Sequence, residues 1–207
     1  MIMNEVIKNY NKLYAENDVT FGEGKSDSVV QDILKYKQSG TVLEIGAGEG
    51  RHSLFLAGKG FDVEALDSSD AGIAKLQEAA KKNGLKVETH VGDASSFQPE
   101  KKHDIVVVTF VLHHLPREQA MAVIQMMKEN ANPGGFNALA GFMKDGDFYR
   151  ENPETNNLYF DTDEMKTLYA DWEILDYSEK RGQAFQKRED GSPMFNITAR
   201  ILARKPV

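Results

Sequence analysis

The stretch Val42-Leu43-Glu44-Ile45-Gly46-Ala47-Gly48-Glu49-Gly50 decides the fold of this chain. An apolar run that ends in an acidic residue and opens into a glycine loop is typical of a buried parallel strand followed by a nucleotide-binding turn. Residues 53–57 then have a helical pattern. Glycines carry no Cβ that would block a bound cofactor, and the free amides at a helix N-terminus attract acceptor groups. We therefore expect a nucleotide pocket at this loop.

Strand patterns and helical stretches alternate along much of the chain. Strands are predicted over residues 62–67, 86–91, 103–110 and 136–142, of which 103–110 is the most apolar, and residues 117–130 have a helical pattern. Pro133-Gly134-Gly135 predicts a turn before the last of these strands. Two further strands, 172–179 and 195–203, are expected to pair antiparallel around a turn at Asp190-Gly191. The alternation predicts an α/β fold with a doubly wound, mostly parallel sheet.

Length and composition are those of an ordinary globular protein. The 207 residues suit a single domain, with N-terminal helices over 1–38, a cofactor-binding core over 40–142 and a C-terminal substrate-side region over 143–207. No apolar run approaches the roughly 20 residues that span a bilayer, and the first residues do not have a secretory pattern. We therefore expect a cytoplasmic protein without membrane attachment, either a monomer or a homodimer.

The net charge and the cysteine content exclude several classes of binding partner and site. A net charge of −7 argues against binding the phosphate backbone of nucleic acid. The chain has no cysteine, which excludes disulfides, thiolate metal sites and a cysteine nucleophile. We expect no metal site and a small-molecule substrate.

The glycine spacing and its acidic neighbour indicate which nucleotide binds. The dinucleotide fingerprint is G-x-G-x-x-G, whereas here Gly46, Gly48 and Gly50 are spaced by single residues and Arg51 stands where the third glycine would fall. Glu44, two residues before the first glycine, would repel a pyrophosphate and attract an ammonium group. This favours a cofactor that carries an amino acid.

Carboxylates also stand at the ends of the next two predicted strands. Asp67 ends the second strand, where a carboxylate can accept hydrogen bonds from ribose hydroxyls. Asp93 follows the third strand and could accept a hydrogen bond from an adenine amino group. The series predicts an adenosine-containing ligand.

With these motifs in this order, the chain resembles the class I S-adenosylmethionine-dependent methyltransferases over most of residues 40–142. The resemblance implies a Rossmann-like, seven-stranded sheet with a reversed last strand, and S-adenosyl-L-methionine as cofactor, which becomes S-adenosyl-L-homocysteine. It implies that the cofactor is bound by the glycine loop and by residues at the ends of the following strands. These residues are Glu44, Gly46, Ala47, Gly48, Gly50, Arg51, Asp67, Ser68, Asp93, Ala94, Thr109 and Phe110.

Within that class, the segments 50–57, 60–63, 132–135 and 199–205 resemble the tellurite-resistance methyltransferase family. Its members are short and have no large substrate domain. They place a His-Arg pair between the last two strands, where this chain has Phe185-Gln186. The resemblance implies a small-molecule acceptor, with a metalloid oxyanion such as tellurite among the candidates.

Methyl transfer requires mainly alignment and exclusion of water, because the donor is already activated. A base matters only when the acceptor must lose a proton, and His113 and His114, just past the fourth strand, are the candidates. Tyr10, Tyr14 and Phe21 could form an aromatic lid over the sulfonium.

Other interpretations remain open. Arg51 and His52 open the helix after the glycine loop, either as surface residues or to orient an anionic substrate. The shared glycine loop and Asp67 also suit a nicotinamide-dependent oxidoreductase, which Glu44 and the missing third glycine disfavour. A third hypothesis is a non-catalytic S-adenosylmethionine-binding protein.

Overall fold

The computed structural model describes residues 2–18, 20 and 25–207, so Phe21 of the predicted aromatic lid lies outside the described residues. Within these residues, seven strands form one sheet in the order β3-β2-β1-β4-β5-β7-β6. The strands are β1 (Thr41–Ile45), β2 (Asp62–Asp67), β3 (Val87–Val91), β4 (His103–Thr109), β5 (Ala131–Phe142), β6 (Glu173–Lys187) and β7 (Pro193–Arg204).

The strand directions confirm the predicted fold class. β1 pairs in parallel with β2 and β4, β2 with β3, and β4 with β5. β7 runs antiparallel to both of its neighbours, β5 and β6. The fold is therefore a Rossmann-like, doubly wound α/β sheet that is mostly parallel, with a reversed C-terminal strand.

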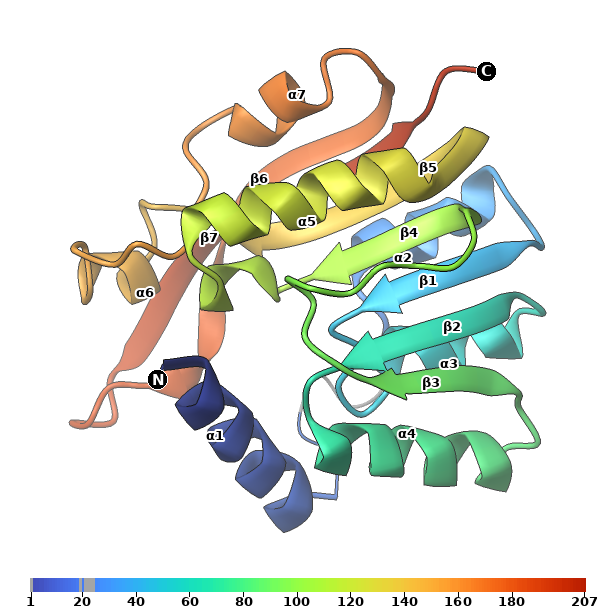
Figure 1. The fold of residues 1–207 in the computed structure, drawn as a ribbon. Helices are drawn as coiled ribbons and strands as arrows, with labels where there is room; N and C mark the ends of the chain where they lie inside the picture. Colours follow the sequence, from blue (N-terminus) through green and yellow to red (C-terminus); the bar gives the residue numbers. More distant parts are fainter. Residues whose placement is uncertain (1, 19, 21–24) are drawn as a thin grey trace.

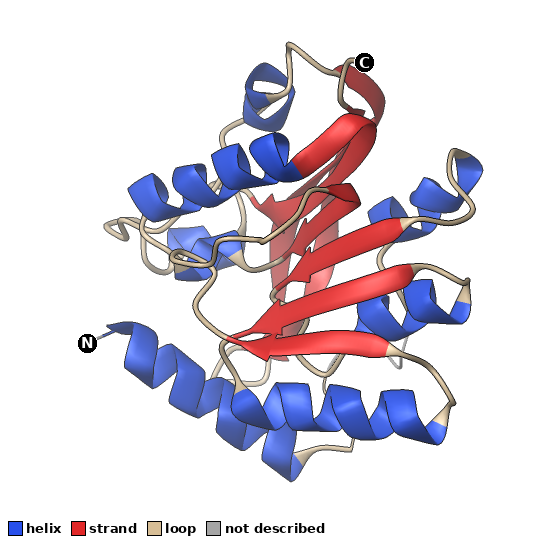
Figure 2. Ribbon diagram, turned by 45° about the vertical axis from the view of Figure 1, so that its right-hand side comes forward, coloured by secondary structure: helices blue, strands red, loops and turns tan. Residues whose placement is uncertain are grey.

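Helices cover both faces of this sheet (Figures 1 and 2). They are α1 (Ile2–Glu16), α2 (Ser28–Asp32), α3 (Arg51–Gly58), α4 (Asp70–Lys82), α5 (Arg117–Asn130), α6 (Asp147–Arg150) and α7 (Glu164–Leu168). A hydrophobic cluster lies on each face of the sheet. Successive side chains of β1 join different clusters, because successive strand residues point to opposite faces. Leu43 packs in the cluster that contains Val123 of α5, and Val42 packs in the cluster that contains Val30 of α2.

The predicted turn at Pro133-Gly134-Gly135 is wrong as a strand boundary. β5 begins at Ala131 and runs through these residues. Its pairing with β4 jumps from His103–Ala131 to Ile105–Phe136, so the extra residues are absorbed as an irregularity inside the strand. Gly134 takes a φ of 70° there, which is the local conformation that the turn pattern had indicated.

The C-terminal hairpin is longer than the sequence predicts. β6 extends to Lys187, well beyond its predicted end at 179, and β7 begins at Pro193, slightly before the predicted 195. Cross-strand pairing carries these polar residues into the ladder, which overrides their weak strand pattern. The short helix α6 was likewise not predicted, because four residues carry no periodic signal.

α1 lies across the carboxyl ends of the first three strands (Figure 1). Asn11 of α1 hydrogen bonds through its side chain to Ser69, the N-cap of α4. Among the described residues, none of the helices is both long and apolar enough to cross a bilayer.

Candidate active site

The candidate site lies at the carboxyl ends of β1, β2, β3 and β4. In doubly wound sheets, ligands bind outside the strand ends at the point where the strand order reverses, which is between β1 and β4 here. The glycine loop follows β1 at this point, and α3 begins at its end. The topology therefore brings the predicted cofactor residues to one edge of the sheet.

The glycine loop adopts a backbone that other residues rarely take. Gly46, Gly48 and Gly50 have φ angles of 77°, 55° and 88°. A Cβ on Gly48 would lie 2.3 Å from the hydroxyl oxygen of Tyr14 on α1, and one on Gly46 would lie 2.0 Å from a methyl carbon of Val111. The loop therefore depends on glycine both for its conformation and for the close approach of its neighbours. Ala47 between them is buried, and Arg51 after them is half-buried.

Asp67 holds the loop through backbone amides. Its Oδ2 accepts a hydrogen bond from Gly48 N at 2.7 Å, and its Oδ1 accepts one from Ser69 N at 2.8 Å. Burial raises the pKa of Asp67, and the backbone hydrogen bonds oppose that rise. A carboxylate has about four lone-pair sites, so Asp67 keeps acceptor capacity for a ligand hydroxyl. Ser68, the next residue, is half-buried.

Asp93 stands at the adjacent strand end. Gly92 N donates to the Asp67 carbonyl at 2.9 Å, which joins the two ends. The Oδ1 atom of Asp93 accepts hydrogen bonds from both the amide and the hydroxyl of Ser95, each at 2.8 Å. Ala94 is half-buried against the core. The predicted pair of carboxylates is thus brought together, as the order of the motifs requires.

Glu44 differs from the sequence expectation of an open carboxylate. It is 1% exposed, and its two oxygens are bonded by side chains of α3: His52 Nδ1 lies 2.8 Å from Oε1, and the Ser53 hydroxyl donates to Oε2. His52 is 3% exposed, so its interpretation as a surface residue is wrong. The Thr109 hydroxyl lies 3.4 Å from the same ring nitrogen. This network was not predicted, although polar residues that open a helix beside an acidic strand end were a signal for it.

The two candidate histidines lie in the turn after β4. His114 Nε2 is 2.9 Å from the hydroxyl of Tyr10 on α1, and the rings of His113 and His114 are 3.8 Å apart. Burial lowers the pKa of His114 to about 4. Burial, followed by the neighbouring His114, lowers the pKa of His113 well below its usual value. Both imidazoles are therefore neutral near pH 7 and able to accept a proton or a hydrogen bond.

Aromatic side chains surround this turn. Phe110 has a φ of 56°, an uncommon conformation for a bulky residue, and its N–H donates to Ala140 of β5 at 2.9 Å. The centroid of the Phe142 ring lies 5.1 Å from that of Phe110, 4.8 Å from that of His113 and 5.0 Å from that of Phe148. Strained residues persist where the surroundings hold them, often at ligand sites.

Several buried polar side-chain atoms near this edge have no hydrogen-bond partner among the residues that the structure describes. They include Thr20 Oγ1, Ser26 Oγ, His52 Nε2 and His113 Nδ1. Such groups are costly to bury unpaired, so each is a position where a polar ligand would supply a partner. Together with the glycine loop and Asp67, these atoms fit an adenosine cofactor that carries an amino acid.

The hairpin position that corresponds to the family's His-Arg pair lies in β6. Phe185-Gln186 falls where the pairing with β7 is irregular, between Gln183 and Lys187. The neighbouring cation, Arg188, donates to Asp147 Oδ2 at 2.8 Å. Its charge is therefore already matched by a carboxylate.

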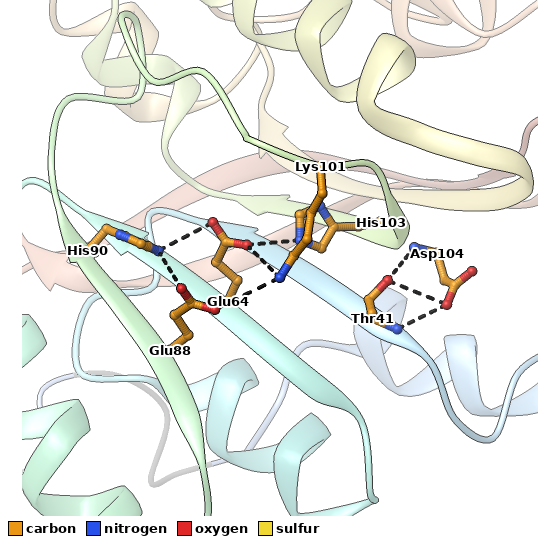
Figure 3. A network of polar contacts seen from close by, with 7 residues as sticks. All are labelled: Thr41, Glu64, Glu88, His90, Lys101, His103 and Asp104. Carbon is orange, nitrogen blue, oxygen red and sulfur yellow. Dashed lines mark hydrogen bonds and ion pairs between the residues drawn. The ribbon is translucent and has the colours of Figure 1, made fainter.

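A second group of ionisable side chains lies along β2, β3 and the start of β4 (Figure 3). Glu64 is hydrogen bonded to His103 Nε2 at 3.0 Å and lies 3.3 Å from His90 Nε2. Lys101 is 3.7 Å from Glu64, and Glu88 is 3.8 Å from His90. Within the described part of the chain, no group of three or more His, Asp or Glu side chains has an arrangement that could hold a metal ion. The network instead ties the strands to one another.

Comparison with known proteins gives a consistent result. The model of the family described as tellurite resistance protein TehB matches residues 8–200. A probable S-adenosyl-L-methionine-dependent methyltransferase TehB of Haemophilus influenzae is 34% identical over 176 residues, which cover 85% of this chain and 61% of that protein. The crystal structure of TehB from Haemophilus influenzae has a TM-score of 0.78 and 33% identity, over 87% of this chain and 62% of that one. This chain thus spans about three fifths of the length of these relatives.

More distant structures share the fold. The N-methyltransferase NodS from Bradyrhizobium japonicum, crystallised with S-adenosyl-l-homocysteine, has a TM-score of 0.71 at 16% identity and covers 97% of this chain and 98% of its own. That likeness concerns the fold alone.

Proposed function

This chain belongs to the tellurite resistance protein TehB family, and from that membership we propose that it is an S-adenosyl-L-methionine-dependent methyltransferase acting on a small molecule. The bound cofactor would supply a methyl group on a sulfonium sulfur. Transfer moves that methyl to the acceptor, leaves S-adenosyl-L-homocysteine, and releases a proton when the acceptor carries one.

The observation that carries this proposal is the arrangement of Asp67. Its carboxylate is half-buried at the end of β2, backbone amides hold both oxygens, and acceptor capacity remains for a ribose hydroxyl. Its bond to Gly48 couples the ribose position to the glycine loop. We propose that Asp93 accepts from the adenine amino group, with Ser68, Ala94, Thr109 and Phe110 lining the same cofactor.

The chain's own residues would mainly exclude water and position the reactants. Tyr14 packs over Gly48 from α1, and Tyr10 reaches His114 across the site. For an acceptor that loses a proton, we propose His113 or His114 as the base, because both imidazoles are neutral near pH 7. The C-terminal region, residues 143–207, would form the acceptor side.

Tellurite is a candidate acceptor because of the family, although Phe185-Gln186 replaces the family's His-Arg pair. The negative charge of the chain favours a small molecule over nucleic acid. An acceptor panel of tellurite, selenite, small thiols and phenols, assayed by methyl transfer from labelled S-adenosylmethionine, would identify the class.

Calorimetry with S-adenosylmethionine and S-adenosylhomocysteine tests the cofactor directly. We expect saturable binding with one ligand per chain, and no binding at high micromolar ligand would overturn the proposal. A parallel fluorescence titration with NADH should be flat, since binding there would favour the oxidoreductase. Cofactor binding without turnover across the whole panel would instead favour a non-catalytic binding protein.

A further inference from the structure

The imidazole of His52 has one satisfied nitrogen and one unsatisfied nitrogen. Nδ1 lies 2.8 Å from Glu44 Oε1, whereas Nε2 is buried and has no hydrogen-bond partner among the described residues. The ring is 3% exposed and sits at the start of α3, directly after the glycine loop. An unpaired buried nitrogen costs free energy unless something supplies its partner.

Glu44 cannot meet a ligand as an open carboxylate. It is 1% exposed, Ser53 holds its second oxygen, and His52 holds the first. Its charge can therefore reach a ligand mainly through the His52 ring, as carboxylates behind histidines do in metal and catalytic sites.

The hydrogen bond between His52 and Glu44 determines which kind of ligand group can bind to His52 Nε2. A carboxylate only accepts hydrogen bonds, so Nδ1 carries the proton that it donates to Glu44. In the neutral ring, Nε2 then presents a lone pair backed by a buried negative charge. A cationic donor, such as an ammonium group, is the matching partner.

The surroundings of the ring are consistent with a polar ligand group. The carboxylate of Asp27, the N-cap of α2, is already paired with Arg200 at 2.8 and 2.9 Å. Ser26, the residue before it, has a buried hydroxyl oxygen without a partner in the described chain. Thr20 N donates to Glu49 Oε1 at 2.7 Å, so Thr20 lies against the glycine loop.

We propose that His52 Nε2 receives the ammonium group of the cofactor's amino-acid moiety, and that Glu44 is a positioning residue that acts through His52. This inference rests on the proposed function. It replaces the expectation from the sequence that Glu44 contacts the ammonium directly.

The test measures binding by calorimetry with three ligands: S-adenosylhomocysteine, its analogue without the amino group, and 5′-methylthioadenosine, which has no amino-acid end. His52→Asn keeps a donor where Nδ1 stands and removes the atom at Nε2. This variant should bind S-adenosylhomocysteine about 10- to 100-fold more weakly, as expected for the loss of a charge-assisted hydrogen bond. Affinity for the other two ligands should stay within about twofold.

Ser53→Ala is the matched control, because it removes the other hydrogen bond of Glu44 and leaves His52 Nε2 in place. It should change the affinities for the three ligands by the same factor. If His52→Asn also changes all three equally, or leaves S-adenosylhomocysteine unaffected, the ammonium contact is wrong. A wild-type protein that binds none of the three overturns the proposed function, and this inference with it.

A measurement on the wild-type protein covers the case in which His52→Asn does not fold. Histidine-selective ¹⁵N NMR should report His52 as the Nδ1–H tautomer, and S-adenosylhomocysteine should shift its Nε2 resonance. The analogue without the amino group should leave that resonance unshifted, and an equal shift with both ligands would contradict the proposal. Glu44→Gln, which keeps the side-chain shape and removes the charge, should lose affinity only for S-adenosylhomocysteine.

Discussion

The hydroxyl of Tyr10 lies 2.9 Å from Nε2 of His114, so α1 is bonded directly to the turn that follows β4. The two residues are 104 positions apart in the sequence. Burial and the nearby Asp67 carboxylate raise the pKa of Tyr10 to about 12, and burial lowers the pKa of His114 to about 4. At neutral pH the phenol therefore keeps its proton and His114 is uncharged, so the hydrogen bond joins two neutral groups.

Tyr10→Phe should lower the free energy of unfolding by about 1 kcal/mol, because it leaves His114 Nε2 without its partner while keeping the ring. Tyr149→Phe is the control, since the Tyr149 hydroxyl makes no hydrogen bond to the described residues and its ring packs on Tyr159 at 5.3 Å. Urea unfolding measures both. Equal effects of the two variants would show that the Tyr10 hydrogen bond contributes nothing.

Stability should fall as the pH is lowered from about 6.5 towards 4. The folded pKa of His114 is about 4, below the ordinary value of 6.5, so the unfolded chain binds more protons in this window. A single such group contributes a slope of about 1.4 kcal/mol per pH unit, which vanishes above the unfolded pKa. His114→Gln should flatten the slope measured by urea unfolding between pH 7 and pH 4. An unchanged slope would contradict the burial of this imidazole.

Asp67→Ala should lower the affinity for S-adenosylhomocysteine by about 100-fold or more, because it removes the carboxylate proposed to hold the ribose hydroxyls. Asp62→Ala is the matched control, since Asp62 is exposed at the other end of the same strand. Calorimetry measures both affinities. Similar effects of the two substitutions would remove Asp67 from the proposed site.

Gly48→Ala should destabilise the glycine loop by about 1–3 kcal/mol, because the added Cβ is strained at a positive φ and meets the Tyr14 hydroxyl. It should also lower the affinity of the protein for the cofactor. Gly182→Ala is the control, since a Cβ there has no neighbour within 4 Å. Thermal unfolding compares them, and a Gly48→Ala protein as stable as the control would show that the loop tolerates a side chain.

Asp27→Asn should lower the free energy of unfolding by about 3 kcal/mol, since it leaves Arg200 partly buried and without its carboxylate. Asparagine keeps the N-cap acceptor for Val29 N, so the loss would report the ion pair alone. Lys12→Ala breaks an exposed pair with Glu16 and should cost less than about 0.5 kcal/mol. Losses of equal size would show that burial does not strengthen the Asp27–Arg200 pair.

Local pattern was sufficient to predict the central sheet. The bounds of β2 and α5 coincide with the predicted 62–67 and 117–130, because a strand bounded by aspartates and an amphipathic helix of 14 residues each carry a clear local signal. The outer hairpin was predicted too short, since its distal residues are polar and join the ladder only through pairing with each other. The turn at Pro133 to Gly135 was recognised, but its absorption into a strand depends on the neighbouring β4.

The site was predicted at its strand ends and missed in its cross-connections. Asp67 ends one predicted strand and Asp93 follows the next, so the parallel topology brings their strand ends together. The bond between His52 and Glu44 depends on how α3 docks against β1, and the bond between Tyr10 and His114 depends on where α1 docks. Neither docking is encoded in a local pattern, which is why His52 was expected at the surface.

The long antiparallel hairpin of β6 and β7 can vary in length without disturbing the parallel strands that precede it. Side chains alternate between faces with a period of two, so a hairpin that gains or loses residues in matched pairs keeps every remaining side chain on its original face. A change of one residue in a single arm reverses that assignment unless a bulge absorbs it, as the irregular pairing between Ile174 and Asp176 does here. The far end of the hairpin can thus change while the parallel strands keep their pairing.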